Sequence, residues 1–350
     1  MTDSGLVRML ALVGDMADDL QASRGLAGLE RVAPLPPPPG GLLICGMGGS
    51  AIAGDLLVAY AATRGLRLSV WRDYGLPGWV DARTPVILCS YSGNTEECLS
   101  SAREASARRC PRVAISSGGE MACLARDGID GGAPFPLVEV PGGLPPRAAL
   151  GFGLGALAHV LSRLGLLPGV DEEIAAAVST LREGVERLGP ASGPDSPAKS
   201  AARTTLGRML VVYTTSPAAH AAGMRLKAQV NENGKSPALV VPFPELDHND
   251  IVGWEVLRPR RDDFVLLLLR SADENTRTSL RVDVTRELLA EEFHTILEFR
   301  AAGETMLART LSLVQYGDYL SCYLAEAAGV DPVPVARIEI LKQRLQALGE

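Results

Sequence analysis

The sequence predicts an α/β protein of two domains, each with a doubly wound, mainly parallel sheet between layers of helices. Two observations support this fold class. The chain has 350 residues, which is more than one compact core usually needs, so its length favours two domains. Short apolar runs also alternate along the chain with Gly/Ser turns and helical patterns, which is typical of βα units around a parallel sheet.

The first half begins with a helix and continues as βα alternation. Apolar residues at helical spacing predict a cover helix over Leu6–Leu29, which the proline-rich stretch Pro34–Gly41 ends. The predicted strands are Leu42–Cys45, Leu68–Trp71, Pro85–Cys89, Arg112–Ile115 and Leu137–Val140. A further helical pattern over Ala148–Leu164 completes a first domain at residues 1–165.

The second half repeats this plan after a break. A helix over Asp171–Leu188 and the Gly/Pro/Ser-rich segment 189–197 form a predicted connector within residues 166–200. In the second domain, residues 201–350, the predicted strands are Arg208–Tyr213, Phe264–Leu269 and Thr295–Arg300, and the predicted helices are Pro217–Val230, Asn275–Glu291 and Glu304–Ala328. A terminal helix over Val335–Leu348 follows a proline-rich turn, and we expect it to dock across the domains.

Charge and hydropathy exclude two classes of partner. The net charge of -7 and the pI near 5.3 argue against nucleic-acid binding, which normally shows clustered Lys and Arg. Apolar runs such as Phe264–Leu269 are too short to span a bilayer, and the amino terminus lacks the pattern of a signal peptide. We therefore expect a cytoplasmic protein that binds a small anionic ligand.

Cysteine and histidine spacing predict neither disulfides nor a metal site. The six cysteines show no CxxC pattern, so we expect reduced, packed thiols. The four histidines show no HxH or HExxH pairing, so we expect no metal. His159 and His294 stand in apolar surroundings, where packing or an interface is the better explanation. No organic cofactor is expected either.

A glycine-rich loop follows the first predicted strand and precedes a helical pattern. It reads Gly-Met-Gly-Gly-Ser-Ala-Ile-Ala-Gly-Asp over residues 46–55. Glycines let backbone N–H groups approach an anion, and a helix start directs its dipole toward that anion. We therefore predict that Gly48, Gly49 and Ser50 contact a phosphate. The spacing matches neither GxGxxG nor the Walker loop, and a tight turn without a ligand is the alternative.

A second loop, Ser-Tyr-Ser-Gly-Asn-Thr-Glu-Glu over residues 90–97, also connects an apolar strand to a helix. Ser90, Ser92 and Thr95 can direct three hydroxyls, together with helix-terminal N–H groups, at one phosphate without any cation. Hydroxyls that merely cap the helix are the alternative. Two such loops in neighbouring βα units favour the phosphate site.

These two loops resemble the sugar isomerase (SIS) domain of the bifunctional phosphoglucose/phosphomannose isomerases of archaea and some bacteria. The resemblance continues at residues 144–151, 231–238, 244–254 and 340–342, so it covers essentially the whole chain. SIS loops alone also fit sugar-phosphate regulators and transferases, but the later motifs are specific to the isomerases. The resemblance implies two SIS-type αβα sandwich domains, a terminal helix, and metal-independent interconversion of glucose 6-phosphate or mannose 6-phosphate with fructose 6-phosphate.

Aldose–ketose isomerisation needs ring opening, a base that moves a proton between neighbouring carbons, and stabilisation of the enediolate. The resemblance implies that Glu232 is the base and that Arg147 offsets the enediolate charge. It also implies that His248 opens the ring from a neighbouring subunit of an obligate homodimer, while Lys342 assists at the ring oxygen. Each residue alone would more often be an ordinary capping, surface or loop residue.

Two other functions remain open at this stage. A non-catalytic SIS module that senses a sugar phosphate would need the phosphate loops but not all four catalytic candidates. An isomerase of another phosphosugar would keep them. Val333 stands where family members often carry a threonine thought to admit the mannose epimer. The resemblance therefore supports phosphoglucose activity more strongly than phosphomannose activity.

Overall fold

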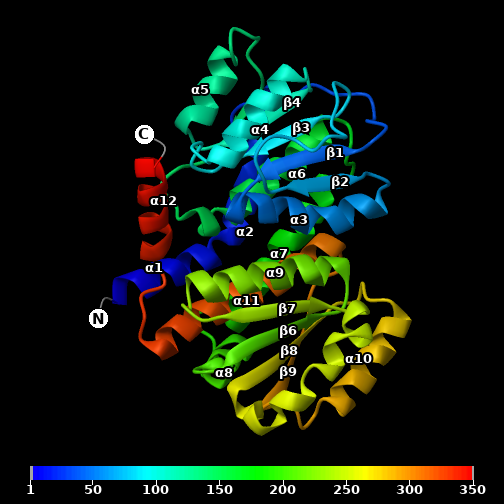
Figure 1. Ribbon diagram of the computed structural model, residues 1–350, viewed down its shortest axis with the longest axis vertical. Coiled ribbons are helices and arrows are strands. Elements are labelled where there is room, and N and C mark those ends of the chain that lie inside the picture. The colour runs from blue at the N-terminus through cyan, green and yellow to red at the C-terminus, as the bar shows by residue number, and fades with distance from the viewer. Residues whose placement is uncertain (1–2, 349–350) are drawn as a thin grey trace.

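The structure, a computed structural model, describes residues 3–348 and contains two parallel sheets (Figure 1). Within these residues, sheet A has the strand order β2-β1-β3-β4-β5 and sheet B the order β7-β6-β8-β9. The strands of sheet A are β1 Leu42–Gly46, β2 Leu68–Trp71, β3 Val86–Cys89, β4 Arg112–Ser116 and β5 Leu137–Glu139. Those of sheet B are β6 Met209–Thr214, β7 Ala238–Pro242, β8 Phe264–Arg270 and β9 Thr295–Arg300. The predicted α/β class is confirmed.

The strands are apolar on both faces because helices cover both faces. Ile44 and Ile87 of neighbouring strands belong to one buried cluster, whereas Leu43 and Leu88 belong to another on the opposite face. Successive side chains of a strand point to opposite faces, so a strand covered on both sides reads as a continuous apolar run. The strands could be predicted from the sequence because of these apolar runs.

The two halves share one plan. In the first, β1 leads through α3 to β2 on one side, and β3 lies on the other; in the second, β6 leads through α9 to β7, with β8 opposite. The helices of the first half are α1 Asp3–Gly14, α2 Met16–Ala22, α3 Gly48–Thr63, α4 Glu96–Ala107, α5 Gly119–Asp127, α6 Leu150–Arg163 and α7 Val170–Leu188. Those of the second are α8 Pro197–Thr205, α9 Pro217–Glu232, α10 Thr276–Leu288, α11 Met306–Ala328 and α12 Ala336–Leu348.

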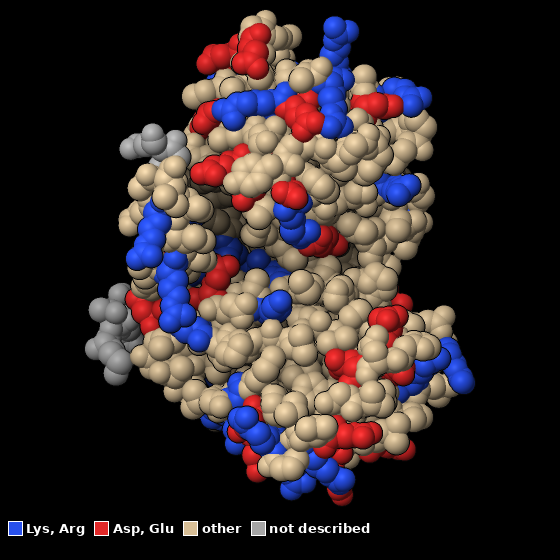
Figure 2. Space-filling model, in the orientation of Figure 1, with Lys and Arg blue, Asp and Glu red and all other residues tan. Residues whose placement is uncertain are grey.

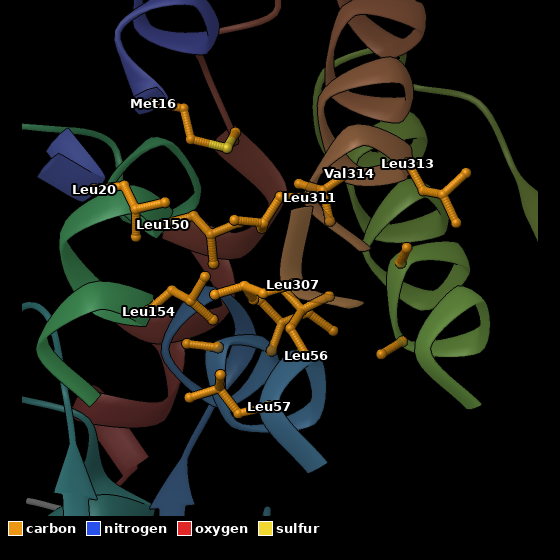
Figure 3. Close-up of a cluster of buried hydrophobic side chains, with 14 of the residues drawn as sticks. Met16, Leu20, Leu56, Leu57, Leu150, Leu154, Leu307, Leu311, Leu313 and Val314 are labelled. Atoms are coloured by element: carbon orange, nitrogen blue, oxygen red, sulfur yellow. The ribbon is translucent and has the colours of Figure 1, made fainter. Parts of the chain in front are cut away.

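Helix α11 joins the halves in a single core. It packs against α7, α8 and α9, and also against α1 and α3 of the first half. Leu307 and Leu311 of α11 meet Leu56 of α3 and Leu150 of α6 (Figure 3). Fully burying one such leucine stabilises a fold by about 1.5–3 kcal/mol. The exact domain limits remain a prediction, because these contacts tie both halves together.

Three elements differ from the sequence prediction. The single cover helix is two helices, α1 and α2, which meet at Gly14 and Asp15, both weak helix formers. Strand β7 was not predicted, because Pro237 and Pro242 leave a very short apolar run between them. Helix α8 begins within the Pro-rich stretch, at Pro197, where proline is tolerated in a first helical turn.

The terminal helix forms as predicted but does not dock across the domains. Helix α12 lies at the edge of the molecule (Figure 1), and the side chains of Ala336–Leu345 are exposed. Ile338 is 42% exposed and Leu341 57%. Its apolar residues therefore find no cover within residues 3–348 of the same chain. None of the described helices is both long and apolar enough to cross a membrane.

Candidate active site

The two glycine- and serine-rich loops meet at the carboxyl ends of β1 and β3. These strands are neighbours in sheet A, and the chain leaves them toward opposite edges of the sheet. A crevice forms at such a switch point in doubly wound sheets, and ligands bind there. The Ser50 hydroxyl accepts a hydrogen bond of 3.2 Å from the Tyr91 N–H, which fixes one loop to the other.

The first loop is shaped for close backbone approach. Gly48 has φ +48°, a conformation that side-chain-bearing residues rarely adopt, and it begins α3. A Cβ placed on Gly49 would lie 2.9 Å from the carbonyl oxygen of Pro146. The loop therefore touches the turn that carries Arg147. The first turn of a helix leaves backbone N–H groups without intrahelical acceptors, so they are available to an anion.

The hydroxyls of the second loop already form hydrogen bonds within that loop. The Ser90 hydroxyl donates to the Thr95 hydroxyl at 3.0 Å, and the Ser92 hydroxyl accepts from the Asn94 N–H at 3.3 Å. Thr95 precedes the first residue of α4, but its side chain makes no capping hydrogen bond. Helix capping therefore does not explain the Thr95 hydroxyl, whose hydrogen-bond partner is the Ser90 hydroxyl.

A cleft of ≈ 590 Å³ lies between α3 and α9, where the two halves face each other. Figure 2 shows a hollow near the midline of the molecule with basic side chains at its floor. Residues from both halves line the cleft, including Gly48, Gly49, Arg147, Arg225 and Glu232. The loop glycines, the candidate base and the candidate charge-stabilising arginine thus share one cavity.

Arg147 is buried and its guanidinium is held on several sides. It is 6% exposed, and it follows Pro145 and Pro146 in a short 3-10 turn. Its Nε donates to Asn233 Oδ1 at 2.7 Å, and its Nη2 donates to the Pro332 and Val333 carbonyls at 2.7 and 2.9 Å. Burial lowers the pKa of Arg147, while Glu232 acts in the opposite direction. An arginine still keeps its charge under such conditions.

Glu232 is the last residue of α9 and faces Arg147 from the other half of the molecule. Its Oε2 lies 3.5 Å from Arg147 Nη1, and its side chain is 31% exposed. Glu232 also lines a second opening of ≈ 670 Å³, together with Lys235, Val335 and Ile338. The carboxylate is therefore held by one cation yet can be reached by a ligand.

The structure does not bring His248 to this cleft. His248 is exposed at the end of the 3-10 helix Glu245–His248, and it does not line the cleft. Its neighbours are anchored: Asp247 accepts from Arg281 at 2.9 Å, and Asp250 accepts from the buried Tyr213 hydroxyl. The loop thus presents His248 outward from its own chain.

Lys342 also stands apart from the cleft in this structure. It lies on the exposed helix α12. Ile338, one helical turn before it and on the same helix face, lines the second opening beside Glu232. Lys342 itself does not line this opening and forms no contact with Glu232.

Sequence reasoning missed the residues that hold Arg147 in place. Asn233 lies in the motif around Glu232, and Arg225 and Asp318 are buried on α9 and α11. In the sequence, these contacts could have been suspected from Asp318, an ionisable residue inside an otherwise apolar helical pattern. His159 is buried as predicted, at 7% exposure, whereas His294 lies beside Asp262, 3.1 Å away. Among residues 3–348, no three His, Cys, Asp or Glu side chains gather as metal ligands would.

Comparison with known proteins adds evidence on the family. The family described as "Bacterial phospho-glucose isomerase C-terminal SIS domain" matches residues 194–345. A bifunctional phosphoglucose/phosphomannose isomerase of Caldicellulosiruptor bescii is 37% identical over 309 residues, covering 87% of this chain and 89% of that protein. The enzyme of the same name from Aquifex aeolicus is 38% identical over 312 residues, covering 87% and 90%.

A solved structure supports the fold. The crystal structure of a glucose-6-phosphate isomerase like protein from Thermus thermophilus superposes with a TM-score of 0.57 and 22% sequence identity, covering 87% of this chain and 90% of that one. This likeness agrees with the predicted α/β fold. On the identity and coverage of its relatives, the chain belongs to the family of bifunctional phosphoglucose/phosphomannose isomerases.

Proposed function

We propose that the protein interconverts glucose 6-phosphate, and mannose 6-phosphate, with fructose 6-phosphate. The observation that carries this proposal is the pairing of Arg147 and Glu232 across one cleft, 3.5 Å apart, beside Gly48 and Gly49 of the glycine-rich loop. A phosphate sensor needs the loop but gains nothing from a carboxylate and a guanidinium at the far end of the ligand. An isomerase needs all three.

The reaction follows from this arrangement. Ser50, Ser90, Ser92 and Thr95, with the start of α3, hold the phosphate and so place the other end of the open-chain sugar at Glu232. The Glu232 carboxylate takes the proton from C2 of the aldose, which leaves an enediolate, and returns it to C1. A second proton passes from the C2 hydroxyl to O1, which gives the ketose. Arg147 stabilises the negative charge that develops on the enediolate oxygens. No metal is required for these steps.

Ring opening requires groups from outside the cleft. We assign it to His248 and Lys342. Because His248 points away from its own chain, it would act in the site of a second subunit, which makes the active form a homodimer. Lys342 would approach the opening beside Glu232 from α12. The ligand is a small sugar phosphate, with no nucleic acid or membrane involved, and a cytoplasmic location fits it.

The turn at Val333 bears on the choice of sugar. Its backbone carbonyl accepts from Arg147, and its side chain is half-buried against the core. A valine offers no hydroxyl to a sugar epimer, so glucose 6-phosphate should be the better substrate. Mannose 6-phosphate should be converted more slowly.

A coupled assay tests the proposal. Fructose 6-phosphate is supplied with glucose-6-phosphate dehydrogenase and NADP, and NADPH formation is followed with and without EDTA. Turnover that EDTA leaves unchanged is expected, together with loss of activity in Arg147→Ala. Tight binding of the sugar phosphate without turnover would instead establish a sensor. Turnover of only a different phosphosugar in a panel would establish another isomerase, and dependence on added zinc would contradict the metal-free mechanism.

A further inference from the structure

Helix α11 carries two buried polar residues at the junction of the two halves. Asp318 is 1% exposed and Ser321 is fully buried. They are three residues apart and therefore lie on the same face of the helix. Buried polar groups are costly unless they are hydrogen-bonded, so their partners indicate their role.

Each residue leads to Arg147 through one intermediate side chain. Ser321 accepts a hydrogen bond of 2.9 Å from the side-chain amide of Asn233, whose carbonyl oxygen accepts from Arg147 Nε. Asp318 accepts from Arg225 at 2.7 Å, and Arg225 donates to the Arg147 backbone carbonyl at 2.9 Å. The guanidinium and the main chain of Arg147 are therefore both held from α11.

The hydrogen-bond directions explain why residue 233 is an asparagine. The Ser321 hydroxyl donates to the Asp318 backbone carbonyl at 2.7 Å, so it needs a donor from residue 233. Arg147 Nε needs an acceptor from the same residue. A side-chain amide offers both a donor and an acceptor, whereas a carboxylate offers only acceptors. Aspartate at this position would leave Ser321 facing an oxygen and would also neutralise the charge of Arg147.

We propose that Asp318 and Ser321, acting through Arg225 and Asn233, are positioning residues that hold Arg147 at Glu232. The arginine comes from the first half of the chain and the glutamate from the second. Docking of the two halves through α11 is then a condition for a competent catalytic pair. This inference rests on the proposed function, because it takes Arg147 as the group that stabilises the enediolate.

The first test compares two buried serines of the same helix. Ser321→Ala removes the partner of Asn233, whereas the matched control Ser312→Ala removes a hydroxyl that bonds Ala302 and Arg309 away from the site. Loss of one neutral hydrogen bond predicts a fall in kcat of about five-fold for Ser321→Ala. Its KM should stay within two-fold, roughly as for the control. Equal kcat values in both variants would overturn the proposal.

The second test separates positioning from general stability by a double-mutant cycle. Asn233→Asp should lower kcat by about 100-fold when Arg147 is present, because a preorganised charge is then neutralised. In an Arg147→Ala background, the same change should cost less than about two-fold, since its target is gone. Residual rates are measured as solvent deuterium exchange into the sugar.

The outcomes separate the two claims. An additive effect of Asn233→Asp in both backgrounds would show a merely structural role and overturn the positioning proposal. Wild-type activity of Arg147→Ala would instead remove Arg147 from the proposed function. The thermal midpoint of each variant is recorded, so that a loss of folded protein is not counted as a loss of kcat.

Discussion

The glycine-rich loop touches the Arg147 turn, so under the proposed function a change at this contact should affect both phosphate binding and catalysis. In Gly49→Ala, the added Cβ would lie 2.9 Å from the Pro146 carbonyl oxygen, 3.3 Å from its carbon and 3.4 Å from the Arg147 Cα. All three neighbours are backbone atoms, which cannot rotate away. The loop and the turn must therefore separate by roughly a few tenths of an ångström, at a cost of about 1–3 kcal/mol in stability.

This displacement moves Arg147 relative to the bound phosphate. A misplacement of about 1 Å typically costs about 100-fold in rate, so a shift of a few tenths should lower kcat/KM by about five- to ten-fold. The assay is steady-state conversion of fructose 6-phosphate, with chemical denaturation for stability. Gly78→Ala is the matched control, because no atom lies within 4 Å of the added Cβ. Equal kcat/KM and stability for the two variants would refute the contact and its coupling.

Three further predictions concern the subunit, the histidines and the thiols. Mixing inactive Glu232→Gln and His248→Ala subunits should restore activity in heterodimers if His248 acts across subunits; no recovery under proven subunit exchange would place the site within one chain. Burial lowers the pKa of His159 and of His220 in the folded protein. The neutral side chains therefore contribute to stability above the unfolded-state pKa of about 6.5, and this contribution is lost as the pH falls through the folded-state pKa values. His159→Gln should therefore make the loss of thermal stability below about pH 6.5 shallower. An unchanged pH profile would contradict this. Burial raises the pKa of Cys45, Cys89 and Cys322 to about 12, whereas Cys123 is exposed. Ellman's reagent should therefore label the native protein at Cys123, and Cys123→Ser should abolish the labelling. Rapid reaction of the variant would show that a buried thiol is accessible.

The architecture could be predicted from sequence because both sheets are covered on both faces. Continuous apolar runs such as Leu42–Cys45 and Phe264–Leu269 are what a two-sided parallel strand requires, and both are strands in the structure. Strand β7 lacked this signal because prolines border it. The position of α12 could not be predicted either. Its apolar residues predict a helix face that packs against another surface, but they do not identify that surface.

The site could be predicted only in part, for a related reason. Strand-to-helix loops are local, so the loops that carry Ser50 and Ser90 could be placed from short motifs, and the strand order brings the two loops into contact. Their role in phosphate binding stays a prediction. Arg147 and Glu232 are 85 residues apart in sequence, and their meeting depends on how α11 docks the halves. The role of Asp318 was hidden, because an aspartate in an apolar pattern does not reveal which arginine it pairs with.

The most direct test of the account is proton transfer at the sugar carbon. Wild-type protein and Glu232→Gln are incubated with glucose 6-phosphate in D₂O, and deuterium at C2 is followed by NMR. Wild-type protein should introduce deuterium at C2, and the variant should lose this exchange while it still binds the sugar phosphate. Undiminished exchange in Glu232→Gln would contradict the claim that Glu232 carries the proton.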